Sequence, residues 1–173
     1  MSVNKYRPHL LVIPEDDANR QIANGFHNHP KLNEHAIQIL PNAGGWGNVV
    51  EEFENLVVQI RRFPERSIVL LVDFDKNENR GDYIRGKIPS ELSGRVFVLG
   101  IFSEPEQWRR ENPSISYERM GMDLAEDCVN NTRKVWGCNL LKHNKDEIER
   151  MIAADVKSFL FGNKWQTHLS TRS

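Results

Sequence analysis

The sequence predicts an α/β protein in which a four-stranded parallel sheet is flanked by helices. Four short apolar runs, each bounded by polar residues, are typical of strands buried on both faces. They cover residues 10–13, 36–40, 68–72 and 95–99. Segments of helical period lie between them, and the resulting alternation of strand and helix favours a parallel sheet.

The first two connections are predicted to be helices. Asp16 or Asp17 is suited to cap a helix after the first strand, with Gly25 and Pro30 marking its end. After the second strand comes the clearest helix of the chain, which Pro64 stops. Its apolar stripe has helical spacing and consists of Val49, Val50, Phe53, Leu56, Val57 and Ile60.

The rest of the chain is expected to be helical apart from the last two strands. A short helix is expected near residues 82–87, and Ser103 with Glu106 has the form of a capping box for another. Apolar stripes then predict a helix around residues 120–128 and a longer one from Asn144 to Gly162.

We expect residues 1–112 to form the α/β domain. Residues 113–173 are then a C-terminal helical extension packed on the same domain, with a frayed end from Asn163 onward.

Composition limits the class of protein. The chain has 173 residues and a formal net charge of -1, which argues against a surface that is basic all over. Cys128 and Cys138 make neither a disulfide framework nor a zinc motif. The sequence shows neither an apolar run of membrane-spanning length nor a signal peptide, so we expect a cytoplasmic protein without a membrane partner.

Acidic residues follow two of the predicted strands. Glu15 comes after the first, and Asp73 and Asp75 come after the third. If the third strand persists through Asp75, both aspartates project to one side about 7 Å apart. Convergent carboxylates suit Mg²⁺ or Mn²⁺, although aspartates at strand ends also commonly cap the next helix or turn.

These acids, with a glycine-containing turn after the second strand, resemble the TOPRIM domain of topoisomerases, primases and overcoming-lysogenization-defect (OLD) nucleases. The resemblance covers roughly residues 8–112. It implies a catalytic role for Glu15 as general acid, general base or metal ligand, and a metal-binding role for Asp73 and Asp75. Glu104 and Glu106 resemble further acidic metal positions of OLD-type nucleases. OLD-type TOPRIM sequences often have Glu-Gly after the first strand. Here Pro14 precedes Glu15 and Asp16 follows it.

Several residues are candidates for holding phosphate or nucleic acid. Gly44, Gly45 and Gly47 precede a helix N-terminus, where N–H groups and the helix dipole favour an anion. Lys76 and Arg80 follow the acidic pair and can hold a phosphate near it. Both features also have ordinary structural explanations, as a tight turn and as solvated surface charge.

The combined hypothesis is a metal-dependent, phosphodiester-cleaving nuclease, or the nuclease subunit of a larger complex, acting on DNA or RNA. The chain has neither a phosphate-binding P-loop nor a strongly basic charge. We therefore expect an ATPase or DNA-binding partner subunit, or a homodimer docked partly through the C-terminal helices.

Two alternatives remain open. The first is a non-catalytic sensor or binding subunit that retains the TOPRIM fold. The second is a phosphoacceptor receiver domain with Asp16, Asp17 and Asp73 as its acidic trio. A receiver requires a hydroxyl residue after the fourth strand and a lysine after a fifth, and the sequence offers neither at the expected place.

Overall fold

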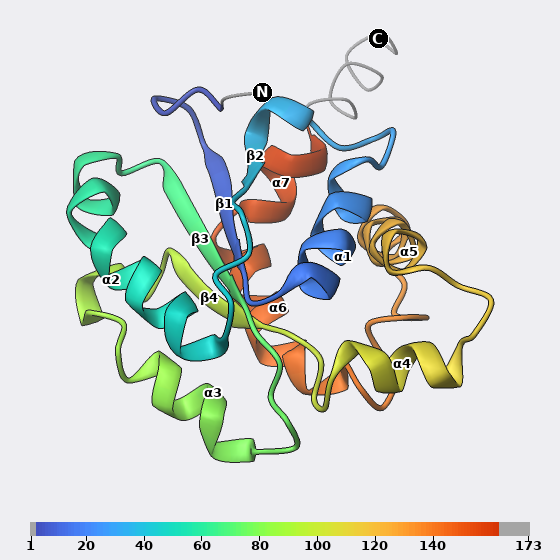
Figure 1. The fold of residues 1–173 in the computed structure, drawn as a ribbon. Coiled ribbons are helices and arrows are strands. Elements are labelled where there is room, and N and C mark those ends of the chain that lie inside the picture. Colours follow the sequence, from blue (N-terminus) through green and yellow to red (C-terminus); the bar gives the residue numbers. More distant parts are fainter. Residues whose placement is uncertain (1–2, 163–173) are drawn as a thin grey trace, which may run out of the picture.

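The computed structural model describes residues 3–162. They form one parallel sheet with helices around it (Figure 1). The expected frayed end from Asn163 onward lies outside the described residues. The sheet has the strand order β2-β1-β3-β4, and every neighbouring pair is parallel, as the sequence predicts. The strands are β1 (His9–Pro14), β2 (Ile37–Ile39), β3 (Arg66–Leu71) and β4 (Val96–Leu99).

Helices cover both faces of the sheet. On one face lie α2 and α3, and on the other lie α1, α5, α6 and α7 (Figure 1). Their bounds are α1 (Asp17–His27), α2 (Trp46–Arg62), α3 (Glu78–Arg85), α4 (Pro105–Glu111), α5 (Tyr117–Asn130), α6 (Lys145–Ala153) and α7 (Val156–Phe161). Within residues 3–162, no helix is both long and apolar enough to cross a bilayer.

Alternation along the strands supplies a core to each helical layer. Leu11 and Ile13 pack under α2 and α3, whereas Leu10 and Val12 point toward α1 and α7. All four side chains are buried. The apolar runs of the sequence therefore correspond to strands that are covered on both faces.

The crossing of α1 and α5 depends on two glycines. A Cβ on Gly25 would lie 1.9 Å from the carbonyl oxygen of Glu118, and one on Gly121 would lie 1.9 Å from that of Ile22. The first helix ends between Gly25 and Pro30, the two residues predicted to mark its end, but Gly25 itself lies inside it. The helix continues to His27, and the glycine permits close approach of two backbones.

The C-terminal helices close the edge of the sheet at β4. The Asn144 side chain accepts from the Gly100 N–H at 3.1 Å and donates to the Gly100 carbonyl at 2.9 Å. The buried Glu147 carboxylate accepts from the Val98 N–H at 2.7 Å and is paired with Arg150. These side chains satisfy an otherwise open strand edge, so η3 (Lys142–Asn144) and α6 pack against β4 and the Gly100 that follows it.

Three helices differ from the sequence-based predictions. The short helix expected near residues 82–87 is α3, which begins earlier, at Glu78, and ends at Arg85. The long C-terminal helix is interrupted at Asp155, whose φ of 61° breaks it into α6 and α7. The N-cap of α4 is Glu104, with Pro105 in the first turn, so Ser103 does not form the predicted capping box. The Ser103 hydroxyl is instead buried without a hydrogen-bond partner.

We predict that Gly25→Ala lowers the free energy of unfolding by about 2 kcal/mol or more, because the methyl group forces α1 away from α5. Chemical denaturation followed by circular dichroism measures this loss. Gly94→Ala is the control, since nothing lies within 4 Å of its added Cβ. Equal stabilities of the two variants would contradict the close crossing.

Candidate functional site

The pairing of β1 with β3 brings Glu15 and Asp73 together at the carboxyl edge of the sheet. Pro14 is in register with Leu71, so the chain leaves both strands at neighbouring points. The Glu15 N–H donates to the Leu71 carbonyl at 2.9 Å, and Glu15 Oε2 accepts from the Asp73 N–H at 2.7 Å. The sheet register therefore fixes two of the predicted site residues side by side.

A buried asparagine joins Asp16 to this pair. Asn19 Nδ2 lies 3.0 Å from Asp16 Oδ1 and 3.0 Å from Asp73 Oδ1. Asp16 also accepts from the Asn19 N–H, which confirms it as the cap of α1. The sequence interpretation missed Asn19. The available signal was an amide on the inward side of an amphipathic helix, one turn after the cap.

Burial and mutual repulsion disfavour charge on these carboxyl groups. Burial raises the pKa of Asp73 to about 8, and the negative charges of Glu15, Asp16 and Asp75 add to this, against the opposing hydrogen bond from Asn19. The pKa of Glu15 is also raised, first by burial and then by Asp16 and Asp75. A bound cation would lower the pKa values of both Asp73 and Glu15.

Asp75 departs from the expected strand geometry. β3 ends at Leu71, and Asp75 has a φ of 47°, so it does not continue a strand beside Asp73. Its half-exposed carboxylate accepts from Arg80 instead. Arg80 also donates to the Asp73 carbonyl at 2.8 Å. Within residues 3–162, no three or more His, Cys, Asp or Glu side chains form a cluster that could hold a metal ion.

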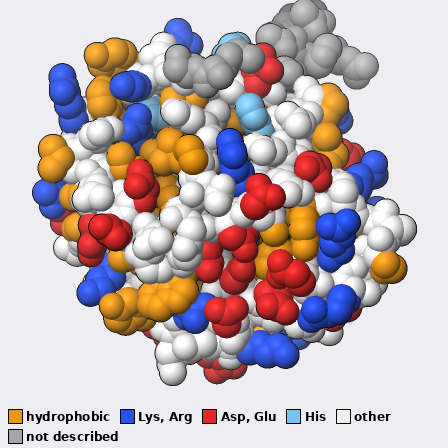
Figure 2. Space-filling model, viewed as in Figure 1, with side chains coloured by type: hydrophobic (Ala, Val, Ile, Leu, Met, Phe, Trp, Pro, Cys, Tyr) orange, Lys and Arg blue, Asp and Glu red, His pale blue; other side chains and the backbone are white. Residues whose placement is uncertain are grey.

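A polar hollow of about 260 Å³ adjoins the acids, between the turn after β3 and α4. Lys76 and Glu104 both line it, and Glu104 is paired with Arg110 at 3.4 Å. Glu106 is exposed and does not line it. The full lining is Asp75, Lys76, Ser103, Glu104, Gln107 and Arg110. Figure 2 shows acidic side chains gathered near the start of α1 and the carboxyl ends of the strands.

The glycine turn contacts Glu15 directly. The N–H groups of Gly44 and Gly45 donate to the Glu15 carbonyl at 2.8 and 3.3 Å. Their φ values of 89° and 138° explain the need for glycine. These two N–H groups, expected to face a phosphate, hold the backbone of the first acid in place. Gly47, in the first turn of α2, is exposed.

An aromatic pair lies beside the acids and was not singled out from the sequence as a unit. Trp46 and Tyr83 meet edge to face with centroids 5.7 Å apart, and Tyr83 is 54% exposed. The Arg80 guanidinium lies 4.9 Å from the centre of the Trp46 ring. Arg80 thus links the aromatic pair to Asp73 and Asp75.

Comparison with family models, with curated proteins and with solved structures found no match to this chain.

We predict that Asp73→Asn raises the free energy of unfolding, and more so at pH 8 than at pH 5. The folded-state pKa of about 8 lies above the value of 3.8 for a solvated aspartate, so ionisation of Asp73 costs stability as the pH rises between these values. Asparagine cannot ionise and can still accept from Asn19. The gain at pH 8 should be on the order of 3 kcal/mol in denaturant titrations without divalent cations.

The exposed Asp17 provides the control, because Asp17→Asn removes the same charge at the start of α1, next to Asp16. The Asp73→Asn gain in unfolding free energy should exceed that of the control and should grow with pH. A gain that is the same at both pH values, or no larger than that of the control, would contradict the raised pKa of Asp73.

Proposed function

We propose that the protein is a metal-dependent nuclease of the TOPRIM type, with Glu15 and Asp73 as the carboxylates that bind Mg²⁺ or Mn²⁺. The observation that carries this proposal is the buried position of the Asp73 carboxyl group beside Glu15. Burial and the negative charges of Glu15, Asp16 and Asp75 raise its pKa to about 8. Its position after β3, beside Glu15 after β1, agrees with the order of acids in the TOPRIM resemblance.

The donor set fits Mg²⁺ in number and chemistry. This ion usually takes one or two protein carboxylates and completes its shell with waters and substrate phosphate oxygens. Glu15 and Asp73 satisfy that requirement without a cluster of three protein ligands. A bound ion would lower the pKa of water and stabilise charge on the leaving oxygen.

The remaining polar groups have roles that follow from their positions. Glu15 lies beside Asp73, where its carboxylate would hold the ion or accept a proton from a water bound to it. Arg80 presents a cation beside Asp73 and Asp75 that can also meet a phosphate. Lys76 lines the adjoining hollow, where the next phosphate of the same nucleic-acid strand can lie. Glu104 then has a structural role as partner of Arg110.

The aromatic pair favours substrates with unpaired bases. Stacking on exposed aromatic rings holds single strands without reading their sequence, and arginine assists through cation–π contact. Tyr83 is exposed, and Trp46 with Arg80 connects it to the acids. We therefore propose single-stranded DNA or RNA, or single-stranded regions, as the substrate.

A net charge of -1 gives little attraction for a polyanion. A partner remains part of the proposal, either an ATPase or DNA-binding subunit or a second copy of the chain.

We predict that Asp73→Ala and Glu15→Gln each reduce Mn²⁺-dependent cleavage of single-stranded substrates at least a hundredfold while the fold persists. Asp17→Asn should retain wild-type activity, because this exposed side chain bonds only Gln21 in the described structure. The measurement is cleavage of labelled DNA and RNA with each cation, with circular dichroism as the folding control.

Three outcomes would refute the nuclease assignment. One is cleavage by Asp73→Ala at the wild-type rate. Another is metal binding at Glu15 and Asp73 without cleavage of any substrate, which would identify a non-catalytic binding subunit. The third is transfer of phosphate from acetyl phosphate to Asp73, which would identify a receiver.

We also predict that Tyr83→Ala weakens binding of single-stranded oligonucleotides about tenfold, since stacking contributes about 1–3 kcal/mol per base. Tyr83→Phe should bind like the wild type, because it retains the ring. Fluorescence anisotropy with Ca²⁺ in place of Mg²⁺ measures binding without requiring cleavage. Equal affinity of the alanine and phenylalanine variants would exclude stacking on this residue.

A further inference from the structure

An apolar cavity of about 290 Å³ lies on the opposite face of the sheet from α2 and α3. Val12, Val69 and Leu99 line it from the strands, and α1, α5, α6 and α7 contribute the other walls. A cavity of about 150 Å³ lined by aliphatic and aromatic side chains binds benzene, so this volume has room for an apolar body of roughly a dozen carbon atoms.

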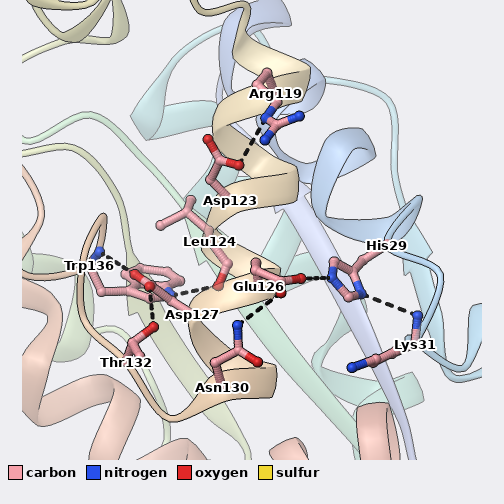
Figure 3. Close-up of polar contacts among 10 residues, drawn as sticks. All are labelled: His29, Lys31, Arg119, Asp123, Leu124, Glu126, Asp127, Asn130, Thr132 and Trp136. Atoms are coloured by element: carbon pink, nitrogen blue, oxygen red, sulfur yellow. Dashed lines mark hydrogen bonds and ion pairs between the residues drawn. The ribbon is translucent and has the colours of Figure 1, made fainter.

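The loop that follows α5 forms one wall of this cavity. Figure 3 shows Asp127 contacts that hold this loop. Asp127 Oδ1 accepts from the Thr132 hydroxyl at 2.6 Å and from the Lys134 N–H at 3.1 Å. Its Oδ2 accepts from the N–H groups of Val135 at 2.7 Å and Trp136 at 3.1 Å. These bonds lower the pKa of Asp127 against the effect of burial. They satisfy its charge and give the loop a defined shape.

The cavity reaches solvent beside two cationic side chains, Arg133 and Lys157. Its exposed lining residues are Asn131, Arg133 and Ile152, which place the opening between this loop and the end of α6. Lys157 also lines the cavity and donates to the neutral Asn131 side chain. No carboxylate is paired with Lys157 within residues 3–162, whereas Arg133 is paired with Glu149 at 3.7 Å.

The interior carries no charge that is available to a ligand. The Cys128 thiol lines the wall, and burial raises its pKa to about 11, so it stays neutral. The positive charge of Lys157 opposes that shift, which places the ammonium group close to the wall. A ligand must therefore be apolar inside the cavity and can be anionic only at its opening.

We propose that this cavity binds a medium-chain aliphatic carboxylate, with its hydrocarbon chain against the sheet and its carboxylate paired with Lys157. An apolar interior with a few polar groups at the entrance is the usual construction of a small-molecule site. The Lys157 ammonium group, whose hydrogen-bond partner is the neutral Asn131 side chain, selects a negative head group. This inference is independent of the proposed nuclease site, with which the cavity shares no lining residue.

Isothermal titration calorimetry of the full chain with decanoate, and separately with 1-decanol, tests the proposal. We expect one decanoate per chain and about tenfold weaker decanoate binding in Lys157→Gln, with decanol binding unchanged. Lys134→Gln is the matched control, since this exposed lysine of the same loop does not line the cavity. Cys128→Leu, which fills part of the cavity, should weaken binding of both probes at least tenfold.

Denaturant unfolding of each variant shows whether it remains folded, and saturating decanoate should raise the stability of the wild type but not of a folded Cys128→Leu. Non-saturable binding, equal effects of the two lysine substitutions, or wild-type affinity in a folded Cys128→Leu would overturn the proposal. Binding that arises only after deletion of residues 163–173 would also overturn it, because the end of the chain would then be the natural occupant.

Discussion

The structure depends on a constraint at the carboxyl edge of the sheet, where β1 and β3 place the Glu15 carboxylate against the backbone of Asp73. Glu15 accepts from the Asp73 N–H, and Asn19 holds Asp73 beside Asp16. Burial raises the pKa values of both Glu15 and Asp73. An arrangement that disfavours its own charge costs stability, so it is better explained by a ligand that compensates the charge than by the needs of the fold.

The sequence predicted the parts of the fold that depend on local patterns. Apolar runs identified the strands, and helical spacing identified α2 and α5. The proximity of Glu15 to Asp73 was predictable because parallel strands end at one edge of a sheet. The direction of Asp75 was not predictable, because a left-handed turn and the contact with Arg80 decide where that carboxylate points. These features depend on tertiary contacts rather than on residue spacing.

The roles of the glycines also depend on tertiary contacts and could not be predicted from the sequence. Gly25 has the composition signal of a helix end, but its reason lies in α5, far along the chain. Gly44 and Gly45 have the signal of an anion-binding turn, but their N–H groups bond the carbonyl of Glu15. The two faces of the sheet also differ. The apolar cavity lies on the α1 and α5 side. The acids lie at the carboxyl edge, and the aromatic pair joins α2 to α3.

The central claim, that the carboxylate group at Asp73 is a divalent-cation site, is tested most directly by following the ¹³C carboxyl resonance of Asp73 through a pH titration. The account predicts a pKa near 8 without divalent cations and a fall of several pH units with saturating Mg²⁺. A carboxyl group that titrates in the ordinary aspartate range and does not respond to Mg²⁺ would contradict it.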